Sequence, residues 1–160
     1  MDEAKKSAYI ESTIPSYATA RPSGDLITAG RQYLTQFFWE RQRHEYKLYV
    51  SQAMVDEISD GDREAAQRRL DFIAGIEKLP EPDGRRELAG VYQQLLKIPN
   101  RAKADCSHLA FCVLRRIDYL LTWNCGHLGP TSQMKVREYN DMHGLWTPTL
   151  ITPEGLMTPM

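Results

Sequence analysis

The chain has 160 residues, 42% of them hydrophobic and 26% charged, with a formal net charge of −1. This length suits one domain with one core, and the near-neutral charge excludes a uniformly basic nucleic-acid-binding protein, so any such site must be a local patch. No apolar run is long enough to span a bilayer, and the charged start of the chain does not lead into a signal-type apolar segment. We therefore expect a cytoplasmic protein with no membrane contact.

The first third of the chain predicts two strands around a long helix. After a flexible start at residues 1–7, the apolar residues 8–10 predict a buried strand that ends at Glu11. Pro15, Pro22 and Gly24 predict a loop, and Asp25 can cap the next helix. Residues 26–38 have an apolar face with helical spacing, and residues 46–51 predict the second strand.

The rest of the chain alternates helices with strands. A short helix over 53–58 carries Glu57, and a second helix spans 65–74. Residues 76–83 predict a loop with room for a short third strand, and a helix follows at 88–96. Asn100 can cap a helix over 102–114, and the apolar run 117–124 is the clearest strand. A weaker helix at 134–143, a strand at 149–151 and a tail over 152–160 complete the pattern.

This alternation predicts a single α/β domain over residues 1–160, with a central parallel sheet between two helical layers. In such sheets ligands bind at the carboxyl ends of the strands. That rule selects three places: residues 11–13, the segment after Ser51, and residues 122–124.

Three carboxylates and one amide converge at this edge if the sheet is wound in the usual right-handed way. They are Glu11, Glu57, Asp105 and Asn124. Like charges held close together require a cation, and oxygen ligands suit Mg²⁺ or Mn²⁺. Such a metal activates water for phosphodiester hydrolysis. Each acid also has a structural interpretation: Asp105 favours the helix dipole, and Glu57 fits a solvated helix face.

Four segments resemble the PIN-domain family, whose members include the VapC-like toxins. They are residues 9–17 (YIESTIPSY), 51–58 (SQAMVDEI), 104–110 (ADCSHLA) and 118–128 (DYLLTWNCGHL). In order, they are similar to the first strand with its acid-Ser/Thr turn, the second-acid segment, the third-acid helix, and the strand and loop with the fourth site residue. The resemblance extends from Tyr9 to about Met157.

The resemblance implies a three-layer α/β/α fold and a magnesium-dependent endoribonuclease, typically the homodimeric toxin of a toxin–antitoxin pair. It implies catalytic roles for Glu11, Glu57, Asp105 and Asn124, the three acids holding the metal, with Ser12, Thr13 and Thr122 supporting them. The family usually has Asp at the place of Glu11 and often a fourth acid at the place of Asn124. A catalytically weak or inactive PIN-like binding module therefore remains the alternative.

Other patterns leave further alternatives open. Cys106 with His108, and Cys125 with His127, suggest zinc, although buried thiols and ordinary histidines fit better because helical residues two apart face different ways. His108 fits an RNA contact or a half-exposed helical histidine. Basic residues fit either a phosphate patch or solvated helix faces: Arg31, Arg41, Arg43, Arg68, Arg69, Arg101 and Lys103. Four aromatics exceed what one core face needs, which predicts that part of this aromatic surface is buried against a second chain or an antitoxin: Tyr33, Phe37, Phe38 and Trp39.

Overall fold

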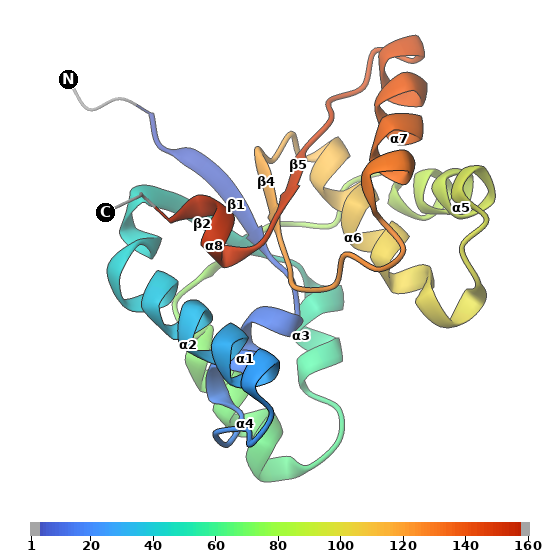
Figure 1. Ribbon diagram of the computed structural model, residues 1–160. Coiled ribbons are helices and arrows are strands. Elements are labelled where there is room, and N and C mark those ends of the chain that lie inside the picture. The colour runs from blue at the N-terminus through green and yellow to red at the C-terminus, as the bar shows by residue number, and fades with distance from the viewer. Residues whose placement is uncertain (1–3, 158–160) are drawn as a thin grey trace.

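The computed structural model describes residues 4–157 and contains one five-stranded sheet. The strands are β1 (Lys6–Ile10), β2 (Tyr46–Val50), β3 (Glu77–Lys78), β4 (Tyr119–Leu121) and β5 (Thr149–Ile151). Their order is β3-β2-β1-β4-β5 and every pairing is parallel (Figure 1). The predicted α/β class with a central parallel sheet is confirmed, and β1 lies at its centre.

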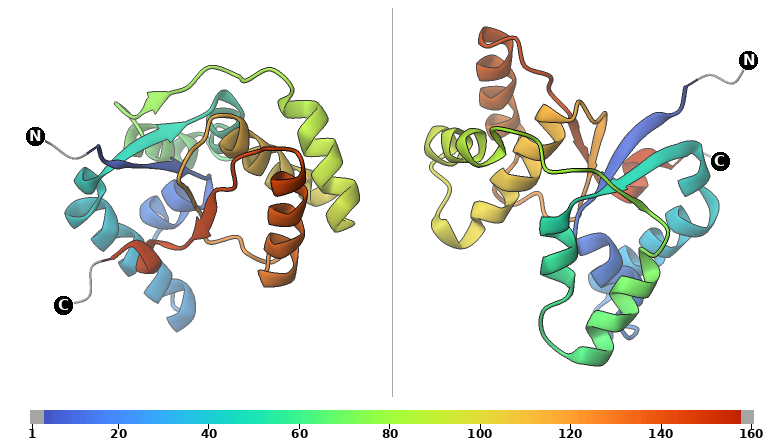
Figure 2. Two further views of the ribbon diagram at one scale, coloured as in Figure 1. Left: turned by 90° about the horizontal axis from the view of Figure 1, so that it is seen from above. Right: turned by 180° about the vertical axis from the view of Figure 1, so that it is seen from behind.

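Helices cover both faces of the sheet. One group comprises α1 (Thr13–Thr19), α2 (Leu26–Arg41), α4 (Arg63–Phe72) and α8 (Pro153–Leu156); the other comprises α5 (Arg85–Leu96), α6 (Lys103–Leu114) and α7 (Pro130–Met142). The two groups lie on opposite sides of the strands, and α3 (Gln52–Ile58) follows the carboxyl end of β2 (Figure 2). Short 3-10 helices span Arg43–Glu45 and Asn100–Ala102. None of the helices within residues 4–157 combines the length and the apolar run needed to cross a membrane.

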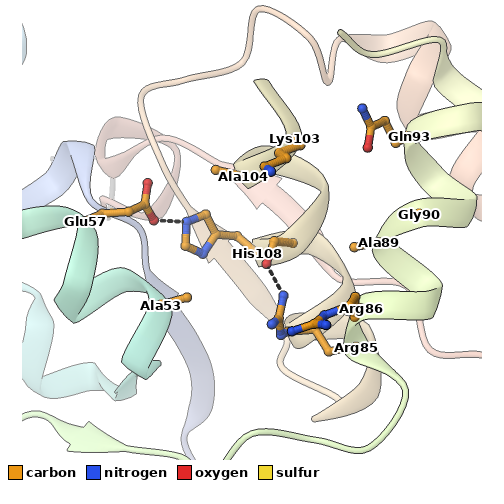
Figure 3. Close-up of a pocket in the computed structure, with 11 residues that line it drawn as sticks. Ala53, Glu57, Arg85, Arg86, Ala89, Gly90, Gln93, Lys103, Ala104 and His108 are labelled. Atoms are coloured by element: carbon orange, nitrogen blue, oxygen red, sulfur yellow. Dashed lines mark hydrogen bonds and ion pairs between the residues drawn. The ribbon is translucent and has the colours of Figure 1, made fainter. Parts of the chain in front are cut away.

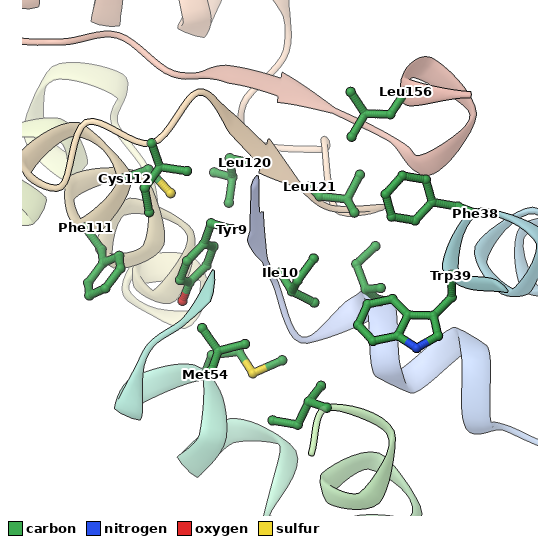
Figure 4. Packing of buried hydrophobic residues seen from close by; sticks show 14 of the residues in the cluster. Tyr9, Ile10, Phe38, Trp39, Met54, Phe111, Cys112, Leu120, Leu121 and Leu156 are labelled. Atoms are coloured by element: carbon green, nitrogen blue, oxygen red, sulfur yellow. The ribbon is translucent and has the colours of Figure 1, made fainter. Parts of the chain in front are cut away.

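The main core packs around β1. Ala8, Tyr9 and Ile10 are fully buried, because β1 is paired on both edges and covered on both faces. Phe38 and Trp39 from α2 pack on one side of it, and Phe111 from α6 on the other (Figure 4). A second cluster joins α5, α6 and α7. The short apolar strands therefore acquire their stability from the helical layers rather than from their own length.

The ends of the domain differ from the prediction. Lys6 and Ser7 belong to β1, so the expected flexible start over 1–7 is wrong at these two positions, while residues 1–3 lie outside the described part. The expected tail over 152–160 contains the short helix α8, and residues 158–160 again lie outside it. Both ends are ordered by the sheet: Lys6 pairs with Tyr46, and Leu156 enters the core.

The loop predicted from Pro15 is also wrong, because Thr13–Thr19 forms helix α1. A proline in the first turn of a helix removes only an N–H that would have no helical partner, so the helix tolerates it. By contrast, Asp25 caps α2 as expected, accepting a hydrogen bond from the Thr28 backbone N–H at 2.9 Å.

Two further expectations need correction. The strand expected over 117–124 contracts to Tyr119–Leu121. Asn100 does not cap α6, because it lies in the preceding 3-10 helix, where its side chain accepts a hydrogen bond from Gln93 at 2.8 Å. The sequence did not predict the short β4 or the 3-10 helix at Asn100, because both depend on tertiary contacts with other parts of the chain.

Candidate functional site

The carboxyl ends of β1 and β4 lie side by side, as predicted. Ile10 pairs with Leu121, and the Glu11 backbone N–H donates to the Leu121 carbonyl at 3.1 Å. Thr122 continues the ladder by donating its N–H to Ile151 at 3.0 Å. Residues 11–13 and 122–124 therefore leave the sheet next to each other.

The Glu11 carboxylate occupies the centre of this edge and is only 6% exposed. Its Oε1 accepts hydrogen bonds from the Thr13 backbone N–H at 3.1 Å, the Thr13 hydroxyl at 2.5 Å and the Thr122 hydroxyl at 2.6 Å. Its Oε2 accepts from the Ser12 hydroxyl at 2.7 Å. Four donors thus satisfy a buried charge, which would otherwise be costly.

The two threonine hydroxyls also accept hydrogen bonds from the chain beyond β4. Thr13 Oγ1 accepts from the Trp123 N–H at 2.9 Å, and Thr122 Oγ1 accepts from the Asn124 N–H at 2.9 Å. Each hydroxyl donates to Glu11 and accepts from a backbone N–H, so its proton and one of its two lone pairs are used. This network fixes the start of α1 against the loop that carries Asn124.

Asp105, in the first turn of α6, has one satisfied carboxylate oxygen. Oδ1 accepts from the Asn124 amide at 3.0 Å. Oδ2 is buried and has no hydrogen-bond partner among residues 4–157. Burial raises the pKa of Asp105 above its usual range, and the charges of Glu11 and, less strongly, Glu57 add to this; His108 and His127 oppose it. Glu11 and Glu57 therefore lie close enough to Asp105 to disfavour its charge.

Glu57 points to His108 on α6 (Figure 3). The imidazole is only 3% exposed; its Nε2 contacts Glu57 Oε1, and its Nδ1 lies 2.6 Å from the Tyr9 hydroxyl. That hydroxyl lies 2.7 Å from Ser51 Oγ. His108 is therefore buried, and the alternative of a half-exposed helical histidine is wrong.

A cleft of about 560 Å³ opens beside Glu57 between α3, α5 and α6. Small side chains and a glycine form much of its wall, and three cations lie on it: Arg85, Arg86 and Lys103 (Figure 3). Arg85 donates to Ser107 and Glu81, whereas Arg86 and Lys103 have no side-chain hydrogen bond or ion pair in the described part of the chain. Of these three cations, the sequence analysis identified only Lys103 as a candidate phosphate contact. Two consecutive arginines at the start of a helix could have indicated Arg85 and Arg86.

Several other arginines of the predicted patch are engaged elsewhere. Arg31 stacks on Trp123, Arg41 on Phe37 and Arg43 on Trp39. Arg69 donates to the carbonyls of Ile58 and Asp60. Their structural contacts account for these four without a nucleic acid.

The expected metal site of Glu11, Glu57 and Asp105 has oxygen donors of a suitable kind, but these side chains are not gathered around one point. Within residues 4–157, no group of three or more His, Cys, Asp or Glu side chains is gathered closely enough to hold an ion. The oxygen donors and the unpartnered Asp105 Oδ2 suit a hard divalent cation. The thiols of Cys106 and Cys112 lie within α6, are buried and belong to the hydrophobic clusters. This fits the interpretation of these cysteines as buried thiols.

Comparison with known proteins adds no assignment to this geometry. No protein-family model matches the chain, and no curated protein matches it. Any function must therefore be argued from the residues at the carboxyl edge and from the cleft beside them.

Proposed function

We propose that this protein is a metal-dependent endoribonuclease of the PIN-like type, with Glu11, Glu57, Asp105 and Asn124 as its site. The observation that supports it best is the Asp105 carboxylate. Oδ2 is buried with no hydrogen-bond partner among residues 4–157, and the pKa of the group is raised by burial and by Glu11. A buried polar atom without a partner costs about 1–3 kcal/mol, and a cation would remove that cost.

The residues suit Mg²⁺ or Mn²⁺. Asp105 Oδ2 offers an oxygen without a partner among residues 4–157. Glu57 is partly exposed, and its charge acts on Asp105. Glu11 retains acceptor capacity on Oε2. When bound, such a metal lowers the pKa of a water and stabilises charge on a phosphoryl oxygen. Ser12, Thr13 and Thr122 would hold Glu11 in place, and Asn124 would orient Asp105 through its 3.0 Å hydrogen bond.

RNA as the substrate is supported by the cations of the cleft next to Glu57. Arg86 and Lys103 project from α5 and α6 with no partner in the described chain, and guanidinium and ammonium groups are the usual phosphate contacts. The apolar part of the wall, which includes Ala53, Ala89 and Gly90, offers a surface against which a base can lie.

A non-catalytic PIN-like binding module is the second candidate. What favours it is Glu11, whose two oxygens already receive four hydrogen bonds without a metal. In this case the carboxylate holds α1 against β4, and the cleft alone recognises RNA or another partner. The two candidates make opposite predictions for metal.

The proposal includes a second chain, either another copy or an antitoxin, on α2. Phe38 and Trp39 pack inside the chain, so they do not take part. Tyr33 is 66% exposed, and Leu26 and Ile27 are 87% and 70% exposed. Light scattering on the purified chain tests this: a strict monomer contradicts the homodimer.

The deciding experiment combines melting curves with an RNA-cleavage assay on the native chain and on Asp105→Asn. Millimolar Mn²⁺ should raise the melting temperature of the native chain and leave Asp105→Asn almost unchanged. Cleavage should fall more than a hundredfold in the variant, since metal stabilisation amounts to several kcal/mol. Asp141→Asn, an exposed acid on α7, is the control and should behave as the native chain does. A native chain that gains no stability from Mn²⁺ and does not cleave RNA would favour the binding module.

A further inference from the structure

Three of the acids at this site lie on three different elements that meet at one buried polar contact. Glu11 follows β1, Glu57 lies on α3 and Asp105 lies in the first turn of α6. His108 on α6 contacts Glu57 through Nε2 and the hydroxyl of Tyr9, on β1, through Nδ1. We propose that His108 is a positioning residue that donates its Nε2–H to Glu57 and thereby sets where that carboxylate lies relative to Glu11 and Asp105.

The direction of the hydrogen bonds follows from counting protons. Ser51 Oγ accepts the Met54 backbone N–H at 3.1 Å, so the serine hydroxyl proton is free to point to Tyr9, 2.7 Å away. A tyrosine phenol carries its proton at neutral pH, so the Tyr9 hydroxyl can donate as well as accept. That proton lies on the line to His108 Nδ1, at 2.6 Å. An imidazole that accepts at Nδ1 carries its proton at Nε2, where Glu57 can accept it.

In this series of hydrogen bonds, from Ser51 through Tyr9 and His108 to Glu57, every buried side chain has a partner. In a neutral imidazole the opposite direction would turn a bare Nε2 toward the Glu57 carboxylate, so that two acceptors would face each other, whereas an imidazolium would again donate its Nε2–H to Glu57. Tyr9 is fully buried and His108 is 3% exposed, and the Tyr9 ring packs against both His108 and Phe111, so these contacts restrain the imidazole. Only one oxygen of Glu57 is occupied by this contact, and the other remains available.

The inference rests on the proposed function, because it assigns Glu57 a ligand or catalytic role. A hydrogen-bonded partner that orients a ligating carboxylate typically contributes 10–100-fold to metal affinity or activity. His108 touches no reacting atom in this scheme, and although it lines the cleft it is only 3% exposed, so it offers RNA little contact surface. It should therefore affect Mn²⁺ affinity and kcat while leaving KM for RNA unchanged.

The first arm of the test needs no metal and no activity. Nitrogen-15 NMR of the histidine-labelled full chain, in metal-free buffer, reports which ring nitrogen of His108 bears the proton. We expect Nε2 to be protonated in the native chain. An Nε2 without a proton overturns the inference, whatever the protein's activity.

The second arm compares variants in Mn²⁺ titration calorimetry and in cleavage. His108→Leu should lose 10–100-fold in Mn²⁺ affinity and in kcat, and His108→Gln, which keeps an N–H donor near Glu57, should recover part of both. Tyr9→Phe removes the hydroxyl that orients the ring and should lose less. Tyr92→Phe is its matched control, since Tyr92 is as deeply buried and donates to Asn140, far from the acids.

The outcomes separate the two proposals. A native chain that binds Mn²⁺ and cleaves RNA, with His108→Leu equal to it, overturns the positioning role alone. A native chain that binds no Mn²⁺ overturns the nuclease, and the NMR arm then still decides the hydrogen-bond direction. Equal losses of Mn²⁺ affinity and kcat in Tyr9→Phe and Tyr92→Phe would indicate general destabilisation. That result would also contradict the positioning role of His108.

Discussion

A carboxylate joins β1 to β4 at each end of that strand pair, yet the two ends differ in what surrounds it. At the amino end, Asp118 accepts the Ser7 backbone N–H at 2.9 Å and the Ser7 hydroxyl at 3.1 Å, and its own N–H donates to that hydroxyl at 2.9 Å. At the carboxyl end, Glu11 accepts four hydrogen bonds. Both carboxylates thus join neighbouring strands through hydroxyl and N–H groups.

The difference is the excess charge at the carboxyl end. Within residues 4–157 the Asp118 carboxylate is hydrogen-bonded to Ser7 alone. At the carboxyl end, the charge of Glu11 adds to burial in raising the pKa of Asp105, whose Oδ2 has no partner among these residues. A strand-joining carboxylate alone is a structural device. A second, unsatisfied carboxylate beside it is unfavourable for folding, and such groups gather at functional sites. The unpartnered Asp105 oxygen therefore distinguishes the candidate site from the capped strand end at Asp118.

The largest expected effect is on stability, from Glu11→Ala. This change leaves the buried Thr122 hydroxyl and the Thr13 N–H without their acceptor, so we expect a loss of about 3 kcal/mol in the free energy of unfolding. Asp118→Ala should lose only about 1.5 kcal/mol, because its partners are closer to water. Urea denaturation measures both. Equal losses would mean that the two ends are equivalent clamps.

The cleft beside Glu57 supplies the next prediction. Gly90 lies on α5 with nothing within 4 Å of an added Cβ, so Gly90→Ala and Gly90→Leu both fit the helix. Only the leucine fills the cleft, and we expect it to weaken binding of a short single-stranded RNA about tenfold, or about 1.4 kcal/mol. Fluorescence anisotropy in metal-free buffer measures this. If both variants bind as the native chain does, the cleft is not the RNA site.

Asp105→Asn should stabilise the metal-free protein by about 1 kcal/mol at neutral pH, since it removes a buried charge with one unpartnered oxygen. The pKa of Asp105 is raised in the folded chain, so the folded state keeps this proton to higher pH than the unfolded state does. The native chain therefore gains stability from this group on acidification and loses it as the pH rises through the raised pKa. The advantage of the variant should shrink at acid pH in urea melts; a constant difference would contradict this origin.

The smallest effect is expected at the amino end. Ser7→Ala removes one hydroxyl shared with Asp118 and should lower the free energy of unfolding by about 0.5–1 kcal/mol. Mn²⁺ stabilisation and RNA cleavage should remain unchanged, because Ser7 lies at the other end of β1 from Glu11. Any change in Mn²⁺ dependence would show that the two ends are coupled through the strand.

Much of the architecture follows from the sequence. The apolar run at 8–10, the strand-forming segments at 46–51 and 149–151 and the helical periodicity between them predict the parallel sheet. Ala8–Ile10 fit a strand buried on both faces, whereas Lys47 and Thr149 remain exposed in the flanking strands. The adjacency of the ends at Glu11 and Thr122 follows from that topology. The acids at strand ends could be selected for the same reason, without knowledge of their partners.

Only the tertiary structure decided what each acid contacts. The sequence predicts that Glu11, Glu57 and Asp105 lie near one edge of the sheet, but the direction of each side chain depends on another residue in the fold: Thr122 for Glu11, Asn124 for Asp105 and His108 for Glu57. Helix α1 was missed because a proline is penalised on average and tolerated at this particular position. Local patterns determine which surfaces must be buried; the meeting of distant side chains, and so the chemistry of the edge, is set by packing.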